Sequence, residues 1–189
     1  MKRYELLVIG GSAGSLQVIL SLLSTTGDDF PVPVLVVLHR NGIFESSLEE
    51  LLSVRTGLTI KEVEEKDLLR PGIVYICPAD YHVLLEQDHS FSLDYSERVH
   101  FSRPSIDVTF RSASDVYGPG LIGLVLSGGN ADGADGLAYI RDRGGLAIVQ
   151  DPLTAEVPYM PQQAISRMQP DFIVPADELP FFIRGLFHK

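Results

Sequence analysis

The chain of 189 residues is poor in cysteine, in long apolar runs and in basic side chains, and each shortage excludes a class of protein. A single cysteine, Cys77, rules out an intrachain disulfide, and its place in the apolar run 73–77 predicts a small buried thiol. The apolar stretches 6–9 and 34–38 fall far short of the roughly 20 residues that cross a bilayer. The N-terminus also lacks a signal-peptide pattern. We therefore expect a cytoplasmic protein with no membrane-inserted segment.

Basic side chains are outnumbered, because 15 Lys and Arg stand against 25 Asp and Glu, for a net charge of −10. The acidic residues are spread along the chain, and no basic stripe is present that would attract a phosphate backbone. Nucleic acid is therefore not an expected partner, and we interpret the negative charge as a contribution to solubility.

The chain also lacks linkers rich in Pro, Gly and Ser, internal repeats and low-complexity tracts. Its length and its 45% of hydrophobic residues are enough to bury a core without disulfides or metal. We expect residues 1–189 to form one domain.

Short β-branched runs alternate with stretches of helical periodicity, which is the pattern of an α/β domain. We predict a single doubly wound, mostly parallel sheet with helices on both faces. A short polar turn predicts an antiparallel hairpin of residues 82–85 and 90–94 within this alternation. The other strands are expected at residues 5–9, 34–38, 59–62, 73–76, 121–126, 146–149 and 172–174, and the helices at residues 16–23, 46–53, 106–116, 136–143, 161–168 and 178–187.

The first predicted strand runs into Gly10-Gly11-Ser12-Ala13-Gly14, which fits the pattern G-x-S-x-G. In that pattern the serine occupies a strained strand-to-helix turn, and its hydroxyl projects above the carboxyl edge of the sheet. Ser12 is therefore a candidate nucleophile, and the Ala13 N–H is a candidate oxyanion donor. A phosphate-binding turn and a plain turn stay open as alternatives. Ser12 breaks the dinucleotide fingerprint, however, and a Walker lysine is absent.

Polar residues follow two further buried strands, at the edge where an open α/β sheet collects functional groups. His39 ends the strand 34–38, and histidine is the side chain suited to general-base work near neutral pH. Asp132 and Asp135 lie in the loop after the strand 121–126, and either carboxylate could orient an imidazole. The residues alone leave open which aspartate does so, or whether both only cap the following helix.

The remaining histidines lie in or near the expected hairpin or at the C-terminus. With the nearby aspartates they follow no spacing typical of a zinc site, so neither a metal nor another cofactor is expected. We expect each to be a plain, partly exposed side chain. They are His82, His89, His100 and His188.

Several stretches along the chain carry motifs that occur together: IGGSAG at residues 9–14, the strand ending in His39, RPSIDV at 103–108, the loop 126–133, MPQQAI at 160–165 and the segment 69–82. In this order they resemble the catalytic domain of the chemotaxis protein-glutamate methylesterases, over nearly the whole chain. The resemblance implies a serine esterase on a doubly wound α/β sheet. That family hydrolyses glutamate methyl esters on the cytoplasmic helices of chemoreceptors, and some members also deamidate glutamine there.

The resemblance also implies a Ser, His, Asp triad in that chain order. The family's nucleophile falls on Ser12, its histidine on His39, and its aspartate on Asp132 and not on Asp135. A second oxyanion donor falls on Gly129. In this scheme the serine attacks the side-chain carbonyl, the histidine passes the proton to departing methanol or ammonia, and water then releases glutamate.

Some positions depart from the family pattern. Gly129 stands where relatives usually have methionine, and Asn130 lies one place before the family's asparagine. Ser102 replaces a frequent histidine before R-P-S. The segment after Ser12 departs from the usual S-T-G-G, and Ser15 is expected to cap the following helix. None of these changes removes a member of the triad.

Most members of the family carry a receiver domain ahead of the catalytic one, whereas the first strand here is expected within five residues of Met1. We therefore expect a stand-alone catalytic domain whose activity is constitutive, or controlled by a separate chain, or directed at a substrate other than a chemoreceptor. The first hypothesis is a methylesterase that acts on a methylated chemoreceptor or a related signalling protein. The second is a non-catalytic docking module with the same fold, which the altered loop around Gly129 favours. A third, a nucleotide-binding protein, depends on residues 10–14 alone.

Overall fold

A computed structural model describes residues 3–27, 30–39 and 45–187. Its large sheet has seven strands in the order β3-β4-β2-β1-β7-β8-β9, and every pairing in it is parallel. A separate antiparallel hairpin consists of β5 and β6. The strands are β1 (Leu6–Gly11), β2 (Val34–Leu38), β3 (Thr59–Glu62), β4 (Ile73–Ile76), β5 (His82–Leu85), β6 (Phe91–Asp94), β7 (Leu121–Val125), β8 (Leu146–Gln150) and β9 (Phe172–Val174).

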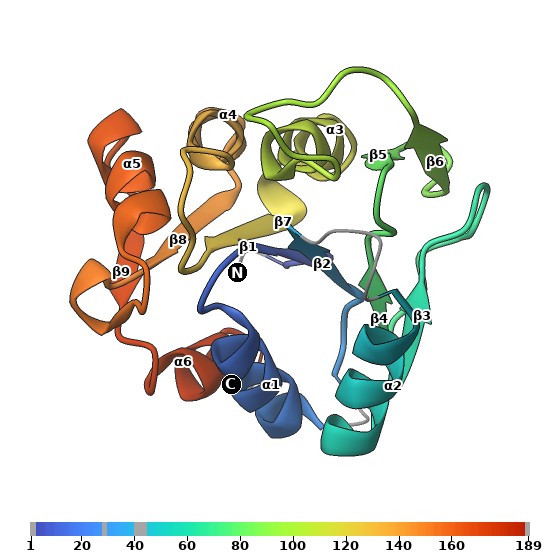
Figure 1. The fold of residues 1–189 in the computed structure, drawn as a ribbon, viewed down its shortest axis with the longest axis horizontal. Coiled ribbons are helices and arrows are strands. Elements are labelled where there is room, and N and C mark those ends of the chain that lie inside the picture. The colour runs from blue at the N-terminus through green and yellow to red at the C-terminus, as the bar shows by residue number, and fades with distance from the viewer. Residues whose placement is uncertain (1–2, 28–29, 40–44, 188–189) are drawn as a thin grey trace.

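Helices cover both faces of the large sheet (Figure 1). Because side chains alternate along a strand, Leu7 and Ile9 of β1 enter the core under α1, α2 and α6, whereas Leu6 and Val8 enter the core under α3, α4 and α5. The predicted doubly wound sheet with a short hairpin is thus confirmed. The helices are α1 (Leu16–Thr26), α2 (Glu45–Thr56), α3 (Ile106–Tyr117), α4 (Ala134–Asp142), α5 (Tyr159–Arg167) and α6 (Leu179–Gly185), with short 3-10 turns η2 (Gly118–Gly120) and η3 (Pro152–Thr154).

The first strand continues past its predicted end at Ile9 into the two glycines. Gly11 pairs with Leu38 of β2, so β1 ends immediately before Ser12. A Cβ built on Gly10 would lie 2.4 Å from Ile106 Cγ2, which explains why only glycine fits where α3 crosses this strand. The other predicted elements are present with ends that differ by a few residues, and the two 3-10 turns were not predicted.

The strand order places a topological switch point at β1. The next strand in the chain, β2, lies on one side of it and β7 on the other, so the connections leave β1 and β7 in opposite directions. The crevice outside the carboxyl ends of strands at such a point is the usual ligand site of an open α/β sheet. Elsewhere in the described chain, Cys77 is fully buried as predicted. None of the described helices has the length and apolar character needed to span a bilayer.

Candidate active site

The three residues predicted for the triad all follow strands that meet at the switch point: Ser12 follows β1, His39 follows β2, and Asp132 lies in the loop after β7. Backbone hydrogen bonds tie these strand ends together. His39 N donates to Gly11 O at 3.1 Å, and Ser12 N donates to Ser127 O at 2.9 Å. Ser12 therefore lies between the other two loops, at one edge of the sheet.

The turn that carries Ser12 is held by its own backbone. Ser15 N and Ser15 Oγ both donate to Ser12 O, at 3.1 and 2.7 Å. Ser15 occupies the N-cap position of α1 as predicted, but its buried side chain turns back to this carbonyl and makes no cap hydrogen bond. Gly14 has a φ of 78°, and a Cβ there would lie 2.5 Å from Glu156 Cβ and 2.7 Å from Ser127 Oγ. The tight turn therefore requires glycine at position 14.

A buried histidine–carboxylate pair lies beside this turn. His39 Nε2 is 2.7 Å from Asp132 Oδ2, and the two side chains are 10% and 0% exposed. An ionised carboxylate only accepts hydrogen bonds, so Nε2 carries the proton of the neutral ring and Nδ1 is its basic nitrogen. The ring is therefore oriented with Nδ1 directed away from Asp132.

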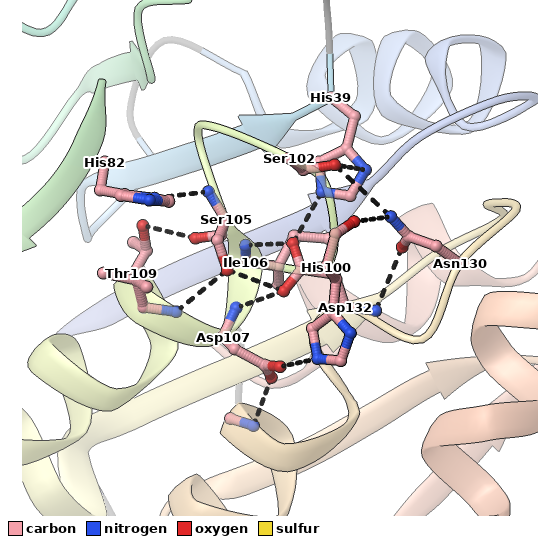
Figure 2. A network of polar contacts seen from close by, with 12 residues as sticks. His39, His82, His100, Ser102, Ser105, Ile106, Asp107, Thr109, Asn130 and Asp132 are labelled. Carbon is pink, nitrogen blue, oxygen red and sulfur yellow. Dashed lines mark hydrogen bonds and ion pairs between the residues drawn. The ribbon is translucent and has the colours of Figure 1, made fainter. Parts of the chain in front are cut away.

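Asp132 lies at the N-terminus of α3, where it accepts three hydrogen bonds besides that from His39 (Figure 2). The donors are Ser105 Oγ at 2.8 Å, Ile106 N at 2.7 Å and Asp107 N at 3.0 Å. Burial alone would raise the pKa of Asp132. The bonds from His39 and from the backbone of α3 nevertheless hold this pKa below its usual value. The helix dipole acts in the same direction, so the carboxylate stays charged at neutral pH.

The structure brings Asp132, and not Asp135, to His39. Asp135 instead pairs with Arg167. Neither aspartate caps α4, since the residue at that position is Gly133 and it makes no side-chain cap. The role of Ser105 and the α3 N-terminus in holding Asp132 was missed by the sequence analysis. The sequence signals this role only through the motif at residues 103–108, which resembles the family but was not assigned a function.

The hydroxyl of Ser102 contacts the basic nitrogen of the pair. Ser102 Oγ lies 3.2 Å from His39 Nδ1, and Asn130 Nδ2 lies 3.4 Å from the same oxygen. Within residues 3–27, 30–39 and 45–187, no hydrogen bond joins Ser12 Oγ to the His39 ring. Catalytic hydrogen bonds are often long before substrate binds. To transfer its proton, the Ser12 hydroxyl must reach His39 Nδ1, either next to the Ser102 hydroxyl or after displacing it.

The two predicted oxyanion donors belong to exposed residues, Ala13 directly after Ser12 and Gly129 in the loop after β7. Neither the Ala13 nor the Gly129 N–H donates to a group in the described part of the chain. Ser127 Oγ donates to Ala13 O at 2.7 Å, and Met160 N donates to Gly128 O at 2.9 Å. Both loops are thus held in place while these two N–H groups stay available for a ligand.

His82 corrects the expectation of a partly exposed side chain, because it is fully buried. Its hairpin packs against α3, and Ser105 N donates to its Nδ1 at 3.1 Å while Nε2 lies 2.9 Å from Glu97 O. His89 and His100 are exposed, as expected, and His188 lies outside the described residues.

Three side chains on the α3–α4 side of the site lie close enough to share a cation: ligand atoms of His100, Asp107 and Asp135 are within 4.8 Å of one another. All three already have protein partners. Asp107 Oδ1 accepts from Gly136 N at 2.6 Å, and Asp107 Oδ2 lies 3.2 Å from His100 Nε2. Asp135 pairs with Arg167.

Asp107 makes the stability of the fold sensitive to pH. Burial raises its pKa to about 6, and the charges of Asp132 and Asp135 add to this shift, while Gly136 N–H and His100 oppose it. Because the folded state favours the protonated form, the stabilisation is full below about pH 4 and is lost as pH rises through about 6. As pH rises from about 4 to about 6, we expect the unfolding free energy of the wild type to fall by roughly 2–3 kcal/mol relative to that of Asp107→Asn, which lacks this titrating group. Urea unfolding of both proteins across this range measures the difference, and parallel pH profiles would contradict it.

A doubly wound α/β sheet with a serine turn beside a histidine–aspartate pair is the arrangement of a serine-type hydrolase. Residues 7–183 match the family model described as CheB methylesterase, and the chain belongs to this family.

Known relatives support this assignment over nearly the whole chain. A provisionally named protein-glutamate methylesterase/protein-glutamine glutaminase of Leptospira interrogans is 44% identical, over 96% of this chain and 94% of that protein. Protein-glutamate methylesterase/protein-glutamine glutaminase 2 of Methanosarcina mazei is 34% identical, over 93% of this chain but 50% of that protein. The crystal structure of the Thermotoga maritima CheB methylesterase catalytic domain is 32% identical, with a TM-score of 0.92 over 97% of this chain and 98% of that one. The predicted family resemblance and fold are therefore confirmed.

Proposed function

We propose that this methylesterase hydrolyses the γ-methyl ester of glutamate side chains in a methylated chemoreceptor or a related signalling protein, with Ser12 as nucleophile and His39 as general base. The observation that carries the proposal is the 2.7 Å contact between His39 Nε2 and Asp132 Oδ2, next to the turn that bears Ser12. The matched part makes up nearly all of one relative and half of another, so we propose the substrate protein from the chemistry of the site. We further propose that the protein acts in the cytoplasm and that residues 1–189 form one domain.

In the first half of the reaction Ser12 Oγ attacks the γ-carbonyl carbon of the substrate. Its proton passes to His39 Nδ1, because the Nε2 proton is bound by Asp132. The oxyanion of the tetrahedral intermediate accepts hydrogen bonds from the Ala13 and Gly129 N–H groups. The intermediate collapses as Nδ1 returns the proton to the methoxy oxygen, so that methanol leaves and a glutamyl ester of Ser12 remains.

In the second half a water molecule attacks the glutamyl ester. His39 Nδ1 takes a proton from the water and returns it to Ser12 Oγ, and the substrate leaves with a free γ-carboxyl group. A glutamine side chain would follow the same course with ammonia as the leaving group. One set of residues therefore serves both esterase and glutaminase chemistry.

The test is methanol release from receptor helices that carry radiolabelled glutamate methyl esters. We expect the wild-type protein to release labelled methanol. Binding of the methylated helices without release would overturn the proposal in favour of a non-catalytic docking module. A thermal shift with ATP or NAD would instead favour a nucleotide-binding protein.

A further inference from the structure

A tight turn beside the site places an aromatic side chain in solvent. Val99 N donates to Ser102 O at 3.1 Å and Ser102 N donates to Val99 O at 2.9 Å, which closes a two-residue turn with His100 and Phe101 at its tip. Their φ angles are 48° and 63°, in the left-handed region. Such turns favour Asn-Gly, because a side chain at these angles is strained. Phe101 is nevertheless 93% exposed, so no packing within the described chain accounts for a phenylalanine there.

The same turn, residues 99–102, is bonded to the groups that form the candidate active site (Figure 2). His100 O accepts from Asn130 Nδ2 at 3.1 Å, and Asn130 Oδ1 accepts from Asp132 N at 3.1 Å. Ser102 Oγ lies 3.2 Å from His39 Nδ1. The residues on both sides of Phe101 are therefore tied to the histidine–aspartate pair, and the exposed ring lies at the rim of the site.

We propose that Phe101 is an apolar contact for the substrate protein, against an apolar side chain on the helix that presents the esterified glutamate. This inference rests on the proposed function. Strained non-glycine residues persist where a function requires them, and Phe101 gains nothing from the fold in return for its strain. An aromatic ring also supplies a large contact area and loses little conformational entropy on binding.

The charge of the protein favours an apolar contact over an ionic one. The chain carries a net charge of −10. Hydrolysis leaves the partner protein with a new carboxylate, which this negative field repels, whereas the uncharged ester gains no attraction from it. An apolar contact such as that of Phe101 supplies affinity that does not depend on this field. A free amino-acid ester carries no helix and so lacks the apolar side chain that this contact requires, and we expect its hydrolysis not to depend on Phe101.

The experiment compares two substrates: methylated receptor helices and N-acetylglutamate γ-methyl ester. With Phe101→Ala we expect kcat/KM for the helices to fall about 10-fold, mainly through KM, as for loss of one aromatic contact. We expect kcat/KM for the small ester to stay within about twofold of wild type. Phe181→Ala is the matched control, because Phe181 is 72% exposed on α6, across the sheet from α3, and it should leave both values unchanged.

A second variant separates binding from folding. Phe101→Gly relieves the left-handed strain, so we expect its Tm to rise by about 2 °C while kcat/KM for the helices falls as it does for Phe101→Ala. Equal kcat/KM values of Phe101→Ala and Phe181→Ala on the helices would overturn the inference. If Phe101→Ala lowered kcat/KM equally for both substrates, the inference would also be overturned, because Phe101 would then affect the active site itself and not the binding of the partner protein. A wild-type protein inactive on both substrates would instead contradict the proposed function.

Discussion

Ser12→Ala is expected to lower the rate of methanol release by roughly 10³- to 10⁶-fold, the range for loss of a nucleophile from a serine triad. In the proposed mechanism no glutamyl ester can form without Oγ, and water must attack the substrate directly. The loss should appear in kcat, since the methyl group of alanine leaves the turn and its backbone hydrogen bonds intact. Single-turnover release of labelled methanol from receptor helices measures this effect.

Ser102→Ala is the matched control, because it removes the hydroxyl that lies 3.2 Å from His39 Nδ1. In the proposed mechanism Ser102 takes no part in bond formation and contributes one hydrogen bond to the imidazole ring, so we expect kcat to fall less than about 10-fold. A Ser102→Ala enzyme as inactive as Ser12→Ala, or a Ser12→Ala enzyme that keeps its activity, would contradict the assignment of the nucleophile.

Asp132→Asn is expected to lower kcat by roughly 10³- to 10⁴-fold, as loss of the charge does in other triads. In the proposed mechanism an imidazolium forms when His39 takes the Ser12 proton, and the neutral amide would no longer stabilise it. Asp132 also accepts from Ser105 Oγ and from the Ile106 and Asp107 N–H groups. One amide oxygen cannot serve all of these donors, so the free energy of unfolding should fall by about 1–3 kcal/mol.

Asp135→Asn provides the comparison within the same loop. Its carboxylate pairs with Arg167 near the surface, and such exposed pairs contribute little to stability. We expect kcat within about twofold of wild type and an unchanged unfolding midpoint in urea. If Asp132→Asn and Asp135→Asn had equal kcat values, the buried carboxylate would have no part in the reaction.

Local patterns predict most of this fold, because each element carries its own signal. The strand 34–38 is an uninterrupted apolar run, and α3 shows helical periodicity, so both were predicted from near neighbours in the sequence. The end of β1 was placed too early, because glycine has low strand propensity. Tertiary contacts set the end of this strand. Gly10 and Gly11 continue it, because Ile106 and Ser15 leave no room for a Cβ at these positions.

The candidate site was predictable only where a residue follows a strand directly. His39 and the loop after β7 are signalled by their positions at strand ends. Ser102 and Ser105 are not, because they contact His39 and Asp132 across 63 and 27 residues of sequence. The burial of His82 was missed for the same reason, since α3 covers it only in the folded chain. Contacts between distant segments leave no periodic pattern in one sequence.

The most direct measurement is peptide mapping after the wild-type protein reacts with a fluorophosphonate. Such a reagent labels a serine hydroxyl that a neighbouring imidazole activates. We predict one adduct, on Ser12, that is absent from Ser12→Ala and strongly reduced in His39→Ala. An adduct on Ser102, or an unlabelled wild-type protein, would contradict the claim that Ser12 is the hydroxyl that His39 and Asp132 activate.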